Sequence, residues 1–353
     1  MTNSVSNFGI VEGFFGPAWS DEARLSFAPF LQKYGGSYYL YAPKRDAHLR
    51  KAWRESWGPE YLDKLSGLRD AFHNHHIKFG VALSPFGLGD IISTSDWTHL
   101  KNKFEILSQL NIDYLGLFFD DMPVSADLLR VQTEVVQLAL KYFPSGLIFC
   151  PSFYSFDPLL DKVFGQRPKG YVEGLKNLIS NDVKICWTGP KVISEEIPRS
   201  HLEEVRLILG RKPFIWENLF ANDGPKNCKF LKLKYFEGRD ESISSETAGV
   251  CFNLMNQPYL SQLVYLSSLL VCEKNLSPIA AFEQSCHELL TPGLAHFIVK
   301  YRTQLLNQGL DKFSDEQKTN FLNELANELT PVAMEIKAWL NGEYLVGPEC
   351  LTD

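Results

Sequence analysis

Short apolar runs alternate with longer amphipathic segments along most of the chain. The runs are rich in branched and aromatic side chains and are bounded by turn residues, a pattern that predicts buried strands. The eight predicted strands cover residues 8–15, 36–44, 78–85, 114–119, 146–153, 183–190, 212–218 and 248–254. Predicted helices lie near residues 21–35, 58–76, 96–110 and 124–142, from Ser200 onward, and over 256–272.

Capping signals mark the ends of two of these helices. Ser20 precedes two acidic residues and predicts an N-cap, and Gly35 predicts the end of the same helix. Ser200 and Glu203 have the spacing of a capping box, which predicts a helix that starts at Ser200.

Eight strands separated by helices over about 250 residues are typical of a (β/α)₈ TIM barrel, whereas doubly wound sheets usually have fewer strands. Later in the chain the pattern becomes helical, over 278–290, 293–308 and 314–341, the last broken or restarted at Pro331. We therefore expect an α/β barrel over residues 1–275. A small C-terminal helical region, 276–353, is expected to pack on it.

Composition and charge narrow the class of protein. With 45% hydrophobic residues in 353, the chain can bury a large core. Its net charge of −7 argues against a nucleic acid or an anionic membrane as partner. No signal peptide precedes Phe8, no apolar run reaches the ~20 residues of a membrane span, and the seven cysteines form no CxxC pair. These features predict a soluble, cytoplasmic protein.

Two adjacent carboxylates, Asp120 and Asp121, end the fourth predicted strand. Barrel active sites are built at the carboxyl ends of the strands, so this position favours chemistry. Carboxylates held side by side resist double ionisation, and the two can therefore take different roles. Both side chains can face one pocket only if the chain bends there. The alternative is that the pair starts a solvated loop or caps the next helix.

Other polar and aromatic residues also follow predicted strands. They are Gly13, Lys44, Tyr154, Trp187, Thr188, Trp216, Asn218 and Asn253. Each has a plainer explanation, such as a solvated lysine or a tryptophan that packs in the barrel wall. None of the eight histidines ends a strand, and no phosphate loop or GxSxG elbow is present. We therefore expect neither a metal nor a cofactor.

Short motifs occur in order between residues 9 and 254. They are GIVEGFFG (9–16), YAPK (41–44), WRE (53–55), FDD (119–121), CP (150–151), WTGPK (187–191) and AND (221–223). Together they resemble glycoside hydrolase family 84, the β-N-acetylglucosaminidases that include protein O-GlcNAcases and enzymes named as hyaluronidases. Residues after 275 carry no motif of this family.

The resemblance implies a retaining, substrate-assisted hydrolysis in which the 2-acetamido oxygen of the sugar attacks the anomeric carbon and forms an oxazoline. Asp120 would orient and polarise the acetamide, and Asp121 would act as general acid and then as base. By the same resemblance, a further set would bind the N-acetylglucosamine-bearing glycoside or glycoprotein: Gly13, Lys44, Asp223 and Asn253 at the hydroxyls, and Tyr154, Trp216 and Asn218 around the acetamido group.

Two other functions are compatible with the residues. A Schiff-base lyase could use Lys44 on the same barrel, although it would leave the acid pair without a role. A catalytically silent sugar-binding barrel would keep the pocket but would not need both acids. We favour the hydrolase over either.

Overall fold

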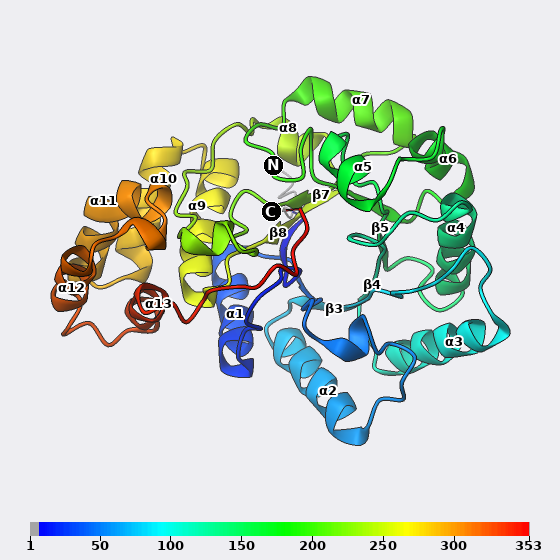
Figure 1. Ribbon diagram of the computed structural model, residues 1–353, viewed down its shortest axis with the longest axis horizontal. Helices are drawn as coiled ribbons and strands as arrows, with labels where there is room; N and C mark the ends of the chain where they lie inside the picture. Colours follow the sequence, from blue (N-terminus) through cyan, green and yellow to red (C-terminus); the bar gives the residue numbers. More distant parts are fainter. Residues whose placement is uncertain (1–6, 353) are drawn as a thin grey trace.

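The computed structural model describes residues 7–352 and has a closed barrel of eight parallel strands (Figure 1). In barrel order these are β1 (Phe8–Val11), β2 (Tyr38–Tyr41), β3 (Lys78–Leu83), β4 (Tyr114–Phe118), β5 (Leu147–Cys150), β6 (Lys184–Trp187), β7 (Phe214–Glu217) and β8 (Gly249–Asn253). Each strand pairs with its neighbour in sequence, and β8 closes the barrel on β1. The predicted TIM-barrel class is confirmed.

Helices surround the barrel (Figure 1). They are α1 (Asp21–Tyr34), α2 (Pro59–Asn74), α3 (Thr94–Gln109), α4 (Leu128–Leu140), α5 (Pro158–Phe164), α6 (Tyr171–Leu178), α7 (Arg199–Leu209), α8 (Ser242–Ser245) and α9 (Pro258–Lys274), with 3₁₀ turns at η1 (Ala47–Leu49), η2 (Asn227–Lys229) and η3 (Leu310–Lys312). None of the helices within residues 7–352 combines the length and apolar character that crossing a membrane requires.

The capping predictions have different outcomes. Ser20 accepts a hydrogen bond from the Ala23 amide at 3.1 Å, and Gly35 ends α1 with a φ of 107°, as predicted. The capping box at Ser200 is wrong, because Pro198 is the N-cap of α7 and Ser200 lies inside the helix. Helices α5, α6 and α8 were not predicted.

The amino end of the barrel interior is filled by aromatic side chains. The Tyr38 ring lies 5.7 Å from that of Tyr114 and 5.9 Å from that of Phe214, measured between ring centroids, and its hydroxyl donates to the Val250 carbonyl at 2.6 Å. A Cβ at Gly9 would lie 2.5 Å from the Tyr38 ring, so the glycine makes room for it. This interior is therefore a packed core, and any binding site must lie at its carboxyl end.

Four further helices pack on one side of the barrel, next to α9 (Figure 1). They are α10 (Pro278–Leu289), α11 (Pro292–Asn307), α12 (Asp315–Glu324) and α13 (Pro331–Leu340), so the predicted break at Pro331 is confirmed. The Glu335 carboxylate accepts hydrogen bonds from the amides of Tyr259 and Leu260 at 2.9 and 2.8 Å and thereby caps the first turn of α9. After α13 the chain returns across the barrel (Figure 1).

Candidate active site

The two acids that follow β4 face one cavity at the carboxyl end of the barrel. Asp121 has a φ of 56°, a left-handed conformation that is uncommon for a residue with a side chain. Because successive residues of an extended strand face opposite ways, this turn allows Asp120 and Asp121 to point into the same space. The bend expected from the sequence is therefore present, at a conformation that usually costs about 1–3 kcal/mol and often marks functional sites.

A single lysine lies between the two carboxylates. Lys44, which follows β2, contacts Asp120 Oδ2 directly through Nζ, and the same Nζ lies 3.5 Å from Asp121 Oδ2. Burial alone would lower the pKa of Lys44, but the two aspartates raise it above its ordinary value, so the side chain is an ammonium. Asp120 Oδ1, by contrast, is buried without a hydrogen-bond partner among the described residues.

The environment of Asp121 favours its protonated form. Burial raises its pKa above the ordinary value, and the neighbouring Asp120 adds to the rise while Lys44 opposes it. The Tyr154 hydroxyl donates to Asp121 Oδ1 at 3.3 Å, and Arg50 Nη2 donates to the Asp121 carbonyl at 3.1 Å. One site thus holds a carboxyl group whose pKa is raised, next to a second carboxyl group in direct contact with an ammonium.

Amide side chains connect three strands around the floor of the cavity. Asn218 Oδ1 accepts from Trp216 Nε1 and from Asn253 Nδ2, both at 2.9 Å, and Asn218 Nδ2 donates to the Val192 carbonyl at 2.9 Å. Asn253 Oδ1 accepts from the Gly13 amide at 3.2 Å. These bonds hold the ends of β1, β7 and β8 in one arrangement and determine which way each amide group points.

Trp216 forms part of the cavity wall because Gly13 has no side chain. A Cβ on Gly13 would lie 2.4 Å from Trp216 Cζ2, closer than any ordinary contact. On its other side the Trp216 ring packs edge-on against Phe118, with 5.1 Å between ring centroids. Trp187, which also follows a predicted strand, is not part of the cavity lining, and its Nε1 donates to His201 Nε2 at 3.0 Å.

Asp223 is a third carboxyl group at the cavity. Its Oδ2 accepts a hydrogen bond from the Phe15 amide at 2.8 Å. Burial raises its pKa to about 7, although the hydrogen bond from Phe15 acts in the opposite direction. Asp223 can therefore exchange its proton near neutral pH.

The cavity gathers most of the predicted site residues. It is lined by Gly13, Phe15, Asp120, Asp121, Cys150, Tyr154, Thr188, Val192, Ile193, Trp216, Asn218, Ala221, Asp223, Asn227, Asn253, Cys350 and Thr352. Lys44 is not part of the cavity lining, although it forms ion pairs with both acids that are. The sequence reasoning missed Arg50, Cys350 and Thr352, and no motif or periodicity marks any of them.

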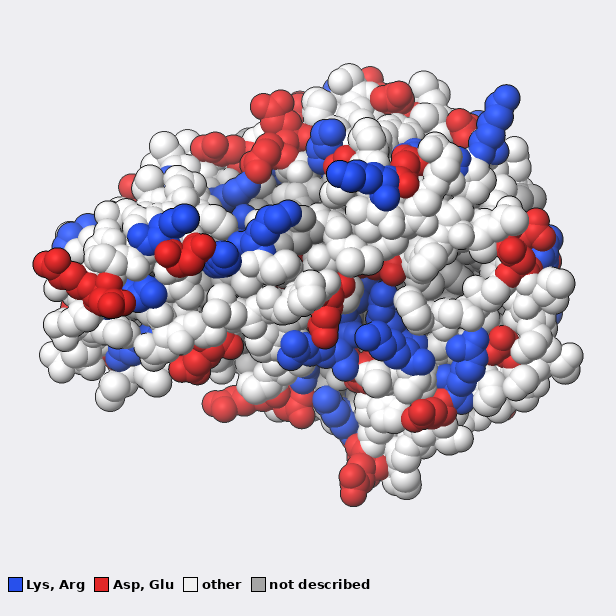
Figure 2. Space-filling view, viewed as in Figure 1, with Lys and Arg blue, Asp and Glu red and all other residues white. Residues whose placement is uncertain are grey.

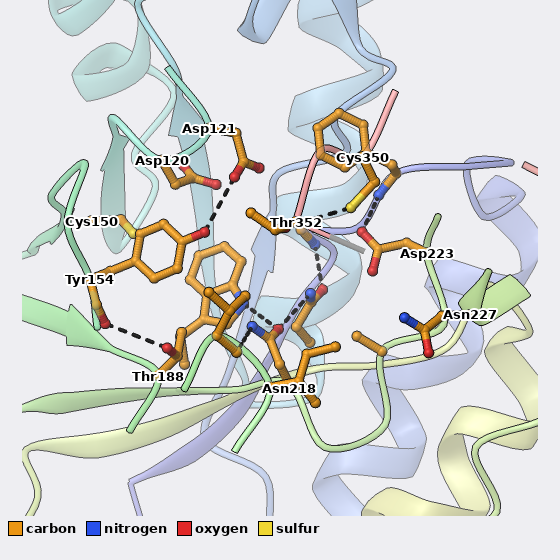
Figure 3. A pocket seen from close by; sticks show the side chains of 17 residues that line it. Asp120, Asp121, Cys150, Tyr154, Thr188, Asn218, Asp223, Asn227, Cys350 and Thr352 are labelled. Atoms are coloured by element: carbon orange, nitrogen blue, oxygen red, sulfur yellow. Dashed lines mark hydrogen bonds between the residues drawn. The ribbon is translucent and has the colours of Figure 1, made fainter. Parts of the chain in front are cut away.

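Cys350 and Thr352 come from the segment that follows α13. In Figure 3 they lie between the side of the cavity that holds Asp121 and the side that holds Asp223. Burial raises the pKa of the Cys350 thiol, and the carboxylates of Asp223 and Asp121 add to the rise. The far end of the described chain therefore shares a cavity with the acids that follow β4.

Comparison with known proteins places this geometry in a family. A family model described as β-N-acetylglucosaminidase matches residues 8–299. The chain is 34% identical over 257 residues to protein O-GlcNAcase of Rattus norvegicus and to that of Mus musculus. These alignments cover 69% of this chain and 27% of each relative, so the chain spans about a quarter of the length of these curated relatives.

A solved structure supports the same relationship. A variant of the Thermobaculum terrenum O-GlcNAc hydrolase aligns with this chain at a TM-score of 0.76 and 25% sequence identity. The alignment covers 95% of this chain and 74% of that chain, and therefore includes helices beyond the barrel.

Proposed function

Because the chain belongs to the β-N-acetylglucosaminidase family of glycoside hydrolases, we propose that it removes terminal β-linked N-acetylglucosamine from O-GlcNAc-type glycosides. The observation that carries the proposal is the arrangement of Asp120, Asp121 and Lys44. Two carboxyl groups face one cavity, and a single ammonium pairs with both of them, more closely with Asp120 than with Asp121. Such an arrangement separates the protonation states of the acids, which acid–base chemistry on a glycoside requires.

The proposed reaction has two steps. In the first, the acetamido oxygen of the substrate attacks the anomeric carbon, the glycosidic bond breaks, and Asp121 donates its proton to the leaving oxygen. Asp120 accepts a hydrogen bond from the acetamido N–H and stabilises the positive charge of the oxazolinium that forms. In the second step Asp121, now a carboxylate, takes a proton from a water molecule that attacks the same carbon and opens the oxazoline with net retention.

Lys44 acts in this proposal as the counter-cation of the acid pair. Its Nζ contacts Asp120 directly, while burial raises the pKa of Asp121 and favours the protonated form of that residue. When Asp121 loses its proton in the first step, the same ammonium is 3.5 Å from its Oδ2 and stabilises the new charge. Its ε-amino group reaches the sugar only if it shifts toward the cavity.

The other lining residues form a pocket of the chemistry that a pyranose requires. We assign Asp223, Asn253 and the backbone of Gly13 to the sugar hydroxyls, because all three line the cavity and carry polar groups. Tyr154, Trp216 and Asn218 are assigned to the acetamido group. Stacked aromatic walls and a few placed polar groups are typical of such sites.

The lyase hypothesis loses support from the electrostatics of Lys44. Schiff-base lysines need a lowered pKa, so that the free amine can attack a carbonyl group. Here two aspartates raise the pKa of Lys44 instead. Trapping with borohydride in the presence of a carbonyl substrate should therefore leave Lys44 unmodified.

Turnover of methylumbelliferyl N-acetyl-β-glucosaminide tests the proposal. We expect hydrolysis with retention, and a rate that falls when the acetamide is replaced by fluoroacetamides, because fluorine weakens the neighbouring oxygen as a nucleophile. A pocket that binds the sugar without turnover would establish a silent sugar-binding barrel instead. Turnover that is insensitive to fluorination would establish a carboxylate nucleophile.

We also propose that the natural aglycone is a protein side chain.

We further propose that residues 1–275 form the catalytic barrel and that residues 276–353 stabilise it by packing on it. The bonds from Glu335 to the start of α9, and a hydrogen bond of 3.0 Å from Trp339 Nε1 to the Cys228 carbonyl, favour this division. A chain that ends at residue 275 would leave the buried face of α9 exposed and should be strongly destabilised.

A further inference from the structure

The segment that follows α13, residues 342–352, runs from the helical side of the molecule to the centre of the barrel (Figure 1). Val346 is buried there, and its Cγ2 packs so closely on the loop after β1 that a Cβ at Gly16 would lie 3.0 Å away. From this anchor the chain enters the cavity, where Cys350 and Thr352 form part of the lining. We call residues 347–352 the strap.

One ion pair holds the strap at the rim. Glu349 Oε2 lies 3.8 Å from Arg45 Nε, and Arg45 directly follows the lysine that contacts both catalytic acids. Figure 2 shows lysine and arginine side chains grouped over the segment between β2 and α2, beside the hollow of the barrel. That segment contains Arg45, Arg50, Lys51 and Arg54, so an acidic residue of the strap meets a basic rim.

The strap leaves little room in the cavity. The cavity volume is about 50 Å³ with Cys350 and Thr352 in its lining. Pockets that bind small molecules usually have volumes of about 300–1,000 Å³. With the strap in its lining, the cavity is therefore smaller than a sugar pocket usually is, although the acids and amides around it are already arranged.

We propose that the strap is an autoinhibitory segment that occupies the aglycone side of the sugar pocket and must lift before a glycoside binds. The inference rests on the proposed function. An O-linked sugar on a protein is carried by a hydroxyl side chain, and the strap places such a group, that of Thr352, in the cavity. The strap thus resembles the peptide part of a glycopeptide without its sugar.

The attachment of the strap is weak enough to open. The Arg45 and Glu349 side chains are 49% and 50% exposed, and an ion pair so accessible to water contributes little to stability. Val346, on the other hand, is anchored in the barrel and does not need to move. Opening therefore requires the strap to move while Val346 stays in place.

The first test compares the full chain with a variant that ends at Val346. If the closed arrangement is populated at about 90%, removal of the strap raises kcat/KM for methylumbelliferyl N-acetyl-β-glucosaminide by roughly 10-fold, because the binding-competent fraction rises to one. A synthetic peptide of residues 347–353 should inhibit the shortened enzyme competitively. An unchanged or lower kcat/KM in the shortened enzyme, with an active full chain, would overturn the proposal.

Point variants separate the effect of the Arg45–Glu349 ion pair from the effect of shortening the chain. Glu349→Gln should raise kcat/KM by a smaller factor than the deletion, whereas Glu343→Gln, which removes the same charge at an exposed position before the anchor, should leave it unchanged. Equal effects of the two substitutions would contradict a specific role for the pair with Arg45.

A measurement that needs no sugar substrate tests the strap independently of the proposed function. The rate at which a thiol reagent modifies Cys350, measured by peptide mass spectrometry, should rise in Glu349→Gln, while that of the half-buried Cys272 on α9 should not. If neither chain hydrolyses the glycoside but Cys350 responds in this way, the proposed function fails and the strap stands. Unchanged modification of Cys350 would overturn the strap.

Discussion

Two buried groups of charges near the ends of the strands are built in opposite ways. At the end of β7, Glu217 pairs with Arg239 through two bonds of 2.8 Å, and Arg239 also donates to the Ser194 carbonyl at 2.6 Å. At the end of β4, two carboxylates share Lys44, and Asp120 Oδ1 has no partner among the described residues. Both groups are buried, yet only in the first do the charges balance and all the polar atoms of both side chains have partners. We call Glu217–Arg239 the closed pair.

The difference indicates what each group is for. A buried ion pair with every donor and acceptor used holds neighbouring segments together, and its loss leaves an uncompensated charge. A group with one cation for two acids instead separates their pKa values and leaves an acceptor for a ligand. The left-handed φ of Asp121 adds strain on the same side. We therefore expect Glu217–Arg239 to contribute to stability and Asp120–Asp121 to reactivity.

The largest effect is expected from Asp120→Asn. The variant keeps the shape of the side chain but removes the charge that stabilises the oxazolinium, so kcat/KM should fall by about 10²–10³-fold on every glycoside. The free energy of unfolding should change less than on loss of a whole ion pair, because Asp121 can ionise in place of Asp120 and pair with Lys44. Steady-state kinetics and urea unfolding measure the two quantities, and a large loss of stability would place Asp120 with the structural ion pairs.

The opposite result is expected at the closed pair. Arg239→Met leaves Glu217 buried without its cation, and such losses typically cost about 3–5 kcal/mol of stability. Arg206→Met is the matched control, since Arg206 is 53% exposed and its pair with Glu246 should contribute at most about 1 kcal/mol. Similar unfolding free energies for the two variants would remove the distinction between the closed pair and a surface pair.

The pH dependence of stability sharpens the comparison further. The pKa of Asp223 is about 7 in the folded protein, above the ordinary value of about 3.9, so folding favours its protonated form. Its contribution to stability is complete below pH ~4 and is lost as the pH rises through ~7. Wild type should therefore lose stability relative to Asp223→Asn across this window. Glu335, whose pKa is raised to about 8 by burial, is present in both proteins and cancels.

A smaller effect is expected on the floor of the cavity. Asn253→Ala removes a polar partner of the sugar and one link to Asn218, and kcat/KM should fall by the equivalent of about 1–3 kcal/mol. The exposed Asn177 on α6 provides a control substitution of the same kind. Normal turnover by a folded Asn253→Ala protein would remove this residue from the sugar site.

The barrel could be predicted because local pattern and global fold agree in this chain. Strands buried on both faces are continuous apolar runs, and each is followed by a turn and an amphipathic helix. Helices α5 and α6 escaped prediction because they are only 7 and 8 residues long, too short for a clear period. The start of α7 was misassigned because Pro198 is the N-cap and the helix begins at Arg199, so Ser200 is already helical.

The candidate site divides in the same way. Residues at the strand ends could be anticipated, because a parallel barrel brings all eight carboxyl ends to one rim. The position of the strap could not be anticipated. It depends on the packing of Val346 against Gly16, and these residues lie in segments that are far apart in sequence and have no periodicity. The contact of Lys44 with both acids likewise depends on the rotamers of three side chains rather than on spacing.

The most direct test of the central claim compares leaving groups in the Asp121→Ala variant. If Asp121 donates the proton, a methylumbelliferyl glycoside should lose about 10²–10⁴-fold in rate, whereas a dinitrophenyl glycoside, whose leaving group needs no proton, should lose far less. Asp120→Asn should be impaired alike on both substrates. Equal losses for both variants on both leaving groups would contradict the division of roles between Asp120 and Asp121.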